Sequence, residues 1–245
     1  MKLRSAPLYK LVKESILTRI AEGEWAPGSF LPSEPVLAEE YDVSHGTLRR
    51  ALDELTRERR LVRYQGKGTA VALLDSDRAL FQFFQIFREN GDRVLPTSKN
   101  LSIELGAGRT DGANAEEAAA LLVSPGERVI RIERVRLIDG VPVFSEYITL
   151  PASRFPQFQD VPPTKIPNTL YDFFQTTYGV TIAHAKECLT AVAASKQDAI
   201  RLHVEPGTPL LAISRISYDI KNSPVELRKS NMMTNGFYYY SEFQG

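Results

Sequence analysis

Cysteine, net charge and long apolar runs are what this sequence lacks. Its 245 residues include one cysteine, and 30 Lys and Arg residues are balanced by 30 Asp and Glu residues. The single Cys188 excludes an internal disulfide and agrees with a reducing compartment, and we expect a buried, unreactive thiol. No apolar run approaches the roughly 18 residues of a membrane span, and residues 1–5 lack a signal-peptide core. We therefore expect a cytoplasmic protein with no membrane partner.

Patterns typical of catalysis and metal binding are absent as well. His184 and His203 stand apart in the sequence, and no Ser/His/Asp or metal-ligand spacing surrounds them. We therefore expect no catalytic residue, no metal and no cofactor, and we interpret these histidines as structural. The length, in contrast, suffices for two domains.

Positive charge is concentrated in one short stretch of the chain. Residues 44–70 hold seven Lys or Arg residues and three Asp or Glu residues. A net charge of zero argues against a nucleic-acid partner, but a local basic patch is the feature by which such a partner is recognised. The sequence around this stretch therefore decides the question.

Three helices are predicted in the first 58 residues. Apolar residues recur at helical spacing over residues 8–20, and Ser33 stands as the N-cap of a second, short helix. Ser44 caps a third helix that runs to about Glu58, and its apolar stripe leaves Arg49 and Arg50 facing outward. A basic helix that follows a short helix in this way fits the major groove of duplex DNA.

A small hairpin is predicted directly after the third helix. Two short strands, residues 61–64 and 69–72, flank Gln65-Gly66-Lys67-Gly68, whose glycines permit a tight turn. Lys67 at the tip is suited to a DNA phosphate or the minor groove. The alternative is a solvated helix face beside an ordinary surface hairpin, but the ordered combination favours a winged helix-turn-helix, mostly α with a small β wing.

Positions 8–71 resemble the N-terminal domain of GntR-family bacterial transcriptional regulators. The matching stretches are Leu31-Pro32-Ser33-Glu34, Leu37-Ala38, Val43-Ser44, Thr47-Leu48-Arg49, Ala51-Leu52 and Gly66-Lys67-Gly68-Thr69. The resemblance implies that the third helix and the wing tip contact double-stranded operator DNA. The expected DNA-binding residues are Ser33, Ser44, His45, Thr47, Arg49, Arg50, Gln65, Gly66, Lys67 and Gly68. Pro35 and His45 depart from the basic residues usual in the family, so the operator sequence is expected to differ.

A second domain is predicted after a short polar stretch. We expect a DNA-binding domain over residues 1–73, a linker over 74–80 and a second domain over 81–245. The dense apolar segment that begins at Phe81 and ends at Gly91 is interpreted as a core or domain-docking helix in preference to an aromatic ligand box. Beyond Gly91, alternating residues predict hairpins at 129–150 and 210–231, and helices are predicted at 114–121, 169–178 and 196–202.

A weak internal repeat organises this second domain. Ser124-Pro125-Gly126 and Glu205-Pro206-Gly207 each follow a short helix and precede an arginine-bearing strand and a hairpin. Two related halves around one sheet predict an α+β domain with an antiparallel sheet.

Charged residues share one face of the predicted strands. Arg134 and Arg136 are one residue apart, Glu146 lies on the returning strand, and Glu226 and Arg228 repeat the spacing. Two adjacent arginines are suited to a phosphate or carboxylate. The alternative, left open by spacing alone, is an exposed ladder of charges paired with one another.

Residues from about 80 to 240 resemble the effector-sensing UTRA domain of the HutC subfamily of GntR regulators, whose fold is similar to that of chorismate lyase. The matching stretches are Arg134-Val135-Arg136, Asp139-Gly140-Val141-Pro142, Ser145-Glu146, residues 169–174, Tyr178-Gly179-Val180 and Pro224-Val225-Glu226-Leu227-Arg228. The resemblance implies a small anionic effector held by Thr97 or Ser98, Arg134, Arg136, Glu146, Thr169, Tyr171, Glu226 and Arg228.

The resemblance therefore predicts a ligand-responsive repressor that acts as a homodimer and whose effector is a phosphorylated sugar, a phosphonate or a carboxylate. Two other function classes stay open. The first is an enzyme, because the implied fold is similar to that of a lyase, although a shared fold does not establish a shared function. Turnover of a candidate anion would reveal it. The second is a non-specific DNA-binding protein, which would bind promoter and random duplex equally well.

Overall fold

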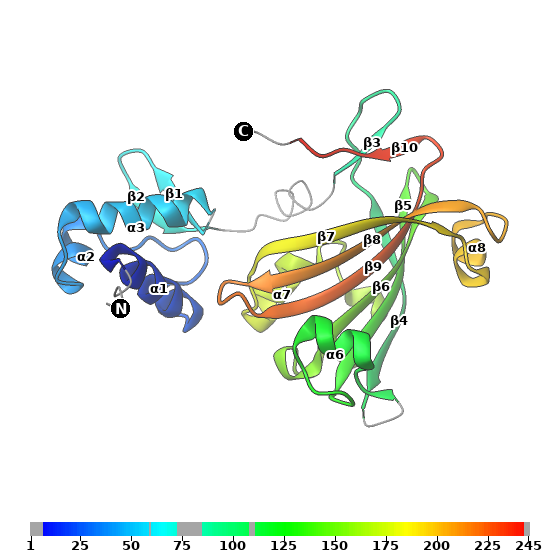
Figure 1. Cartoon of the computed structure of the whole chain (residues 1–245), viewed down its shortest axis with the longest axis horizontal. Helices are drawn as coiled ribbons and strands as arrows, with labels where there is room; N and C mark the ends of the chain where they lie inside the picture. The colour runs from blue at the N-terminus through cyan, green and yellow to red at the C-terminus, as the bar shows by residue number, and fades with distance from the viewer. Residues whose placement is uncertain (1–6, 59, 73–84, 108–110, 243–245) are drawn as a thin grey trace, which may run out of the picture. The chain divides into compact units, whose positions relative to one another are not determined.

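The computed structural model describes residues 7–58, 60–72, 85–107 and 111–242. The chain folds into two compact units, one over residues 1–73 and one over most of residues 74–245 (Figure 1). The predicted linker at 74–80 lies outside the described residues. Each unit has its own hydrophobic core and is described by itself.

The first unit is a three-helix bundle with a two-stranded hairpin, which agrees with the predicted order of elements. Its elements are α1 (Leu8–Ala21), α2 (Glu34–Glu40), α3 (His45–Arg57), β1 (Leu61–Tyr64) and β2 (Gly68–Val71). Apolar residues from all three helices and from β1 meet in the core. They include Ile16, Leu37, Leu48 and Leu61, each at most 1% exposed. The helices are short, so this shared apolar centre supplies most of their stability.

A third backbone segment widens the hairpin and was not predicted. Phe30 forms an isolated bridge with Ala70, and Leu31 donates its N–H to the carbonyl of Thr69 at 2.9 Å. The ring of Phe30 packs on Tyr64, with 5.6 Å between centroids. The wing is therefore held from both sides of β2.

The second unit is built on a six-stranded antiparallel sheet of order β4-β5-β6-β9-β8-β7 (Figure 1). The strands are β4 (Thr97–Gly106), β5 (Val129–Ile138), β6 (Val141–Pro151), β7 (Ile182–Ala193), β8 (Pro209–Asp219) and β9 (Pro224–Met233). The predicted hairpins β5-β6 and β8-β9 are confirmed, and β6 pairs with β9 at the centre. The sheet is thus two three-stranded meanders joined along their third strands.

The predicted repeat is visible in the helices that precede the two hairpins. α6 (Ala115–Leu121) and α8 (Lys196–Leu202) both start with a capping box, formed by Asn114 with Glu117 and by Ser195 with Asp198. Both helices end in a left-handed residue, Leu122 in one case and His203 in the other. The two halves of the domain therefore share local structure as well as sequence spacing.

Different elements cover the two faces of the sheet. α6 and α8 lie on one face, where Arg131 of β5 bonds Glu117 and Asn231 of β9 bonds Asp198. The other face is covered by α7 (Leu170–Tyr178) and three 3-10 turns, which build the main apolar core with β5 and β6. The turns are η1 (Ala152–Arg154), η2 (Phe158–Asp160) and η3 (Pro163–Lys165).

Two predictions about this unit are wrong. Within the segment expected to be helical, Ile86–Arg88 form strand β3, which pairs with β10 (Phe237–Tyr239); Phe81, Phe83 and Phe84 lie outside the described residues. Cys188 is exposed, not buried, because β7 is an edge strand of the sheet. Both errors concern pairing between distant segments, which local patterns do not encode.

Candidate functional site

The start of α3 is fixed by hydroxyl groups expected to meet DNA. Ser44 is the N-cap, and its Oγ accepts from the backbone N–H of Thr47 at 3.2 Å and lies 2.9 Å from Thr47 Oγ1. Ser33 occupies the N-cap position of α2, but its side chain makes no capping hydrogen bond. Ser44 therefore has a defined structural role, whereas the Ser33 hydroxyl has no such role in helix capping.

Arginine side chains stand exposed along α3. Arg49 is 68% exposed, and its Nε lies 3.3 Å from Glu34, which also receives Arg63 at 3.4 Å. Exposed ion pairs of this kind contribute about 0–1 kcal/mol, so DNA phosphate or a base edge competes easily with Glu34 for Arg49. The guanidinium of Arg50 lies 4.0 Å from the ring centre of Tyr9, which gives it a fixed direction.

The wing tip presents only exposed residues. Gln65, Gly66, Lys67 and Gly68 are all exposed, and so is His45 at the start of α3. Gly66 and Gly68 have φ of 72° and 114°, a region that side-chain-bearing residues rarely adopt. The turn therefore depends on glycine and holds Lys67 outward.

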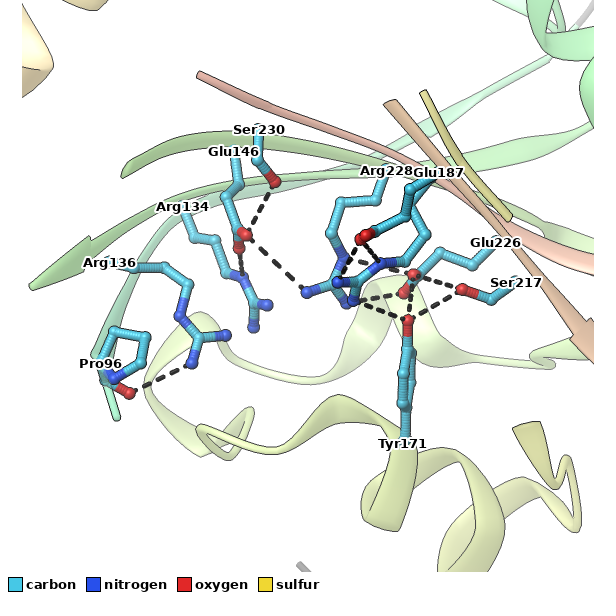
Figure 2. Close-up of polar contacts among 11 residues, drawn as sticks. Pro96, Arg134, Arg136, Glu146, Tyr171, Glu187, Ser217, Glu226, Arg228 and Ser230 are labelled. Atoms are coloured by element: carbon cyan, nitrogen blue, oxygen red, sulfur yellow. Dashed lines mark hydrogen bonds and ion pairs between the residues drawn. The ribbon is translucent and has the colours of Figure 1, made fainter. Parts of the chain in front are cut away.

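A row of buried charges crosses the α7 face of the sheet in the second unit (Figure 2). We define the charged row as Arg134 and Arg136 of β5, Glu146 of β6, Glu226 and Arg228 of β9, Arg215 of β8 and Glu187 of β7. All but Glu187 are 6% exposed or less. The interpretation as an exposed ladder is therefore excluded: α7 covers the row through Tyr171, and the β3-β10 strand pair covers it through Tyr239.

Strand register brings the row together. Glu146 stands opposite Arg134, whose Nε donates to its Oε2 at 2.5 Å. The other carboxylate oxygen of Glu146 accepts from Ser230 at 2.9 Å and lies 3.8 Å from Arg228 Nη1. On β9, Arg228 also donates to Glu226, two residues before it, at 2.8 Å. The row alternates in sign at its centre.

Tyr171 of α7 ties the helix to the row. Its hydroxyl donates to Glu226 at 2.8 Å, lies 2.8 Å from Ser217 Oγ, and accepts from Arg215 Nη1 at 3.5 Å (Figure 2). Arg215 also donates to Glu187 at 2.7 Å. The predicted residue Tyr171 therefore does meet the predicted residue Glu226.

Donors remain unsatisfied at the β5 end. Nη1 and Nη2 of Arg134 are buried and have no hydrogen-bond partner among the described residues, and the same holds for Ser98 Oγ. Nη2 of Arg136 donates to the carbonyl of Pro96 at 3.1 Å, which also accepts from Asn168 at 3.0 Å. A buried donor without an acceptor costs free energy, so these groups favour an anion at this end.

The β5 end of the charged row contains more arginines than carboxylates. Burial lowers the pKa of Arg136 well below its usual value, and neighbouring Arg134 adds to the effect. Burial also lowers the pKa of Arg134, although Glu146 opposes it. Burial alone would raise the pKa of Glu146, yet Arg134 and Arg228 hold it below its usual value. The β5 end therefore carries excess positive charge.

Two predicted effector residues require comment. Ser98 stands opposite Arg136 in the β4-β5 register, whereas Thr97 stands opposite Leu137 and bonds its carbonyl. Because neighbouring residues of a strand face opposite sides, Ser98 lies on the same face as Arg136 and Thr97 lies on the other. Thr169 is the N-cap residue of α7, and its side chain makes no capping bond.

Arg215 and Glu187 were not predicted as site residues. A signal for Arg215 does exist in the repeat, because Arg134 follows Pro125 by nine residues and Arg215 follows Pro206 by nine. No such spacing identifies Glu187, which reaches the row only because β7 pairs with β8.

The row leaves little space near its centre. The cavity that touches Glu146, Arg215 and Arg228 measures about 20 Å³, which is less than one small metabolite needs. Among the described residues, no group of His, Cys, Asp and Glu is arranged to hold a metal ion, and no helix is long and apolar enough to cross a membrane.

Comparison with known proteins identifies both units. The family model for bacterial regulatory proteins of the gntR family matches residues 8–71, and the UTRA domain model matches residues 97–237. The chain is 30% identical over 221 residues to the probable fructoselysine utilization operon transcriptional repressor of Escherichia coli K12, covering 90% of this chain and 88% of that one. It is 32% identical over 210 residues to the histidine utilization repressor of Pseudomonas putida, covering 86% and 82%.

A solved structure supports the same assignment for the second unit. The ligand-binding domain of a putative GntR-family transcriptional regulator from Bordetella bronchiseptica superposes with a TM-score of 0.58 at 31% identity. The match covers 66% of this chain and 98% of that one.

Proposed function

Because this chain belongs to the GntR family of bacterial regulatory proteins and carries a UTRA domain, we propose that its operator affinity is set by a small anionic metabolite bound at the β5 end of the charged row. The chain is a DNA-binding transcriptional repressor of this type with an effector domain, and its relatives are regulators, not enzymes. Two of those relatives are named for the use of fructoselysine and of histidine. By analogy, we expect this chain to repress genes for the use of one nutrient.

The observation that carries the proposal is the unsatisfied guanidinium of Arg134. Its Nη1 and Nη2 are buried without a hydrogen-bond partner in the described part of the chain, beside Arg136 and Ser98. Two guanidiniums and a hydroxyl supply several donors in fixed directions, which suits a phosphoryl group or a carboxylate. An anion also offsets the positive charge that burial makes unfavourable.

Binding of the anion changes the contacts of the row. The carbonyl of Pro96 accepts from Arg136, so an anion at the β5 end competes with this carbonyl for the guanidinium. An effector that binds the rearranged state better than the unliganded one shifts the population toward it. That differential affinity is the free energy available to change operator binding.

A homodimer supplies the link to DNA in this proposal. Two helix-turn-helix heads reach two half-sites about one helical turn apart, so a change in their spacing changes operator affinity. A cytoplasmic location follows from the operator partner.

The test measures DNA release and ligand binding together. A duplex selected for tight binding from a random pool is titrated with the full chain by fluorescence anisotropy, with and without phosphate, sugar phosphates, phosphonates and carboxylates. We expect at least one anion to change operator affinity at least tenfold and to raise the melting temperature of the chain.

Arg134→Gln and Arg136→Gln are expected to remove the response while operator binding persists. The matched control is Arg154→Gln, because Arg154 is a partly exposed arginine paired with Asp219 outside the row. An anion response that survives both row variants would contradict the proposal. Turnover of the anion would favour an enzyme, and equal affinity for random duplex would favour a non-specific DNA-binding protein.

A further inference from the structure

A second, open groove begins where the charged row ends. It has a volume of about 720 Å³, and its walls include Gln85, His184, Glu187, Arg215 and Tyr239. Pockets for small molecules measure roughly 300–1,000 Å³, so this groove is large enough for part of a metabolite. Glu187 and Arg215 belong both to the groove and to the charged row.

The floor of the groove is a balanced ion pair. Arg215 Nε donates to Glu187 Oε1 at 2.7 Å, and Nη2 of the same arginine lies 2.6 Å from that oxygen. The other carboxylate oxygen accepts from the hydroxyl of Tyr239 at 2.5 Å. A cation, an anion and a hydroxyl therefore stand side by side at the edge of an open space.

The two ends of the row differ in the ligand groups that they favour. At the β5 end, Arg134 and Arg136 share one nearby carboxylate, Glu146, which leaves excess positive charge that suits an anion. At the groove end, one arginine is matched by one carboxylate, and this suits a group that carries both signs. Because Nε and Nη2 of Arg215 already contact Glu187, a ligand carboxylate replaces Glu187 at this arginine. The released Glu187, which also accepts from the Tyr239 hydroxyl, then accepts from a ligand ammonium.

The two ends are connected and far apart. The hydroxyl of Tyr171 accepts from Arg215 and donates to Glu226, so polar contacts continue from the groove into the row. Three strand spacings separate β5 from β8. At about 4.8 Å for each spacing, the anion end lies on the order of 14 Å from the groove end. A ligand that contacts both is elongated.

We propose that Arg215, Glu187 and Tyr239 form a second subsite, which binds the amino-acid-like end of an elongated effector whose anionic end lies at Arg134 and Arg136. The inference rests on the proposed function and extends it by stating the length of the effector and its second functional group. The competing interpretation is that the Arg215–Glu187 pair only holds β7 to β8.

A ligand series of increasing length tests the subsite. The probes are α-amino acids that carry a terminal phosphonate, with two to eight methylenes between the α-carbon and the phosphonate. Each is compared with the alkylphosphonate of equal length, which has no ammonium and no carboxylate. Calorimetric titration of the full chain is expected to give at least tenfold tighter binding of the amino acid at one favoured length, and equal affinities at short lengths.

Substitutions at the second subsite test whether the tighter binding of the amino acid arises there. Glu187→Gln and Tyr239→Phe are expected to bring the ratio of the affinities for the amino acid and the alkylphosphonate toward one, whereas Arg134→Gln is expected to weaken binding of both ligands. Melting curves of the unliganded variants report whether each one folds. Equal affinities at every length, or a ratio unchanged in both Glu187→Gln and Tyr239→Phe, would overturn the second subsite while the anion site stands. Failure of all phosphonates and of phosphate to bind would overturn the anion site and the subsite together.

Discussion

Asn100 of β4 and Glu187 of β7 occupy equivalent places in the two halves of the sheet. Asn100 stands opposite Arg134 and Glu187 stands opposite Arg215, in each case on the outer neighbouring strand. Glu187 neutralises its arginine, whereas the amide of Asn100 instead donates to the carbonyls of Pro163 and Ile166. The outer strand thus supplies a carboxylate to Arg215 but not to Arg134, whose carboxylate partner is Glu146 of the inner neighbouring strand.

Replacement of this asparagine is the sharpest test of the anion site. In Asn100→Glu, a carboxylate next to Arg134 is expected to lower the affinity for phosphate or the effector at least tenfold. Removal of the two amide hydrogen bonds costs about 1–3 kcal/mol of unfolding free energy in total. Calorimetric titration and denaturant melts measure the two effects. Asn100→Gln is the neutral control, and an equal drop in affinity in both variants would contradict the electrostatic explanation.

Arg49→Ala is expected to weaken operator binding by roughly 1–3 kcal/mol, because it removes a guanidinium that bridges a base or clamps a phosphate. Anisotropy titration against the selected duplex measures the change. Lys196→Ala removes an exposed cation from the second unit and is expected to change the affinity little. Unchanged binding by Arg49→Ala would show that α3 is not the recognition helix.

Lys67→Ala is expected to weaken binding to the selected duplex and to random duplexes by the same factor, because a phosphate contact carries no sequence information. The slope of log affinity against log salt concentration should become shallower by about 0.9, because one DNA phosphate is no longer neutralised by the protein. Titrations at several salt concentrations measure the slope. A weakening confined to the selected duplex would instead assign base reading to the wing tip.

Arg136→Met is expected to stabilise the chain while it removes the anion response. Methionine keeps much of the volume and eliminates a buried charge, and such replacements raise the unfolding free energy by about 1–4 kcal/mol in favourable cases. Arg131→Met is the control, because it leaves Glu117 without its ion pair and should destabilise. Denaturant melts compare the two, and a clear destabilisation by Arg136→Met would show that Arg136 is structurally required.

Acid is expected to unfold the second unit before the first. Burial raises the pKa of Glu117, Glu146, Asp198 and Glu226, but their ion pairs and hydrogen bonds outweigh it and hold each pKa below its usual value. A depressed pKa contributes stability above the unfolded value, 4.5 for glutamate, and that stability is lost as the pH falls toward the folded value.

The two units report separately on this acid transition. Trp25, the single tryptophan, is 7% exposed in the core of the first unit, so its fluorescence follows that unit. The β-sheet component of the amide I infrared band follows mainly the second unit, because its sheet has six strands and the hairpin of the first unit has two. Coincident transitions below pH 4.5 would contradict the assignment of acid sensitivity to the second unit.

Local patterns predicted the helices, the wing and the two central hairpins, because capping residues and alternation act over a few positions. Alternation also put Arg134 and Arg136 on one face, as observed. It did not reveal that this face is covered, since the cover comes from segments distant in the sequence: Tyr171 of α7 contacts Glu226, and Tyr239 of β10 contacts Glu187. Glu187 and Cys188 were missed or misread for a related reason: the pairing of β7 with β8 is a long-range property.

The two-meander construction separates ligand preference from folding. Both halves supply an arginine at the same backbone position, and the residue opposite it on the outer strand is a carboxylate in one half and an amide in the other. Under the proposed function, substitutions at a few outer-strand positions would therefore exchange one nutrient signal for another in a lineage of such proteins, with the strand pairing of the sheet left intact.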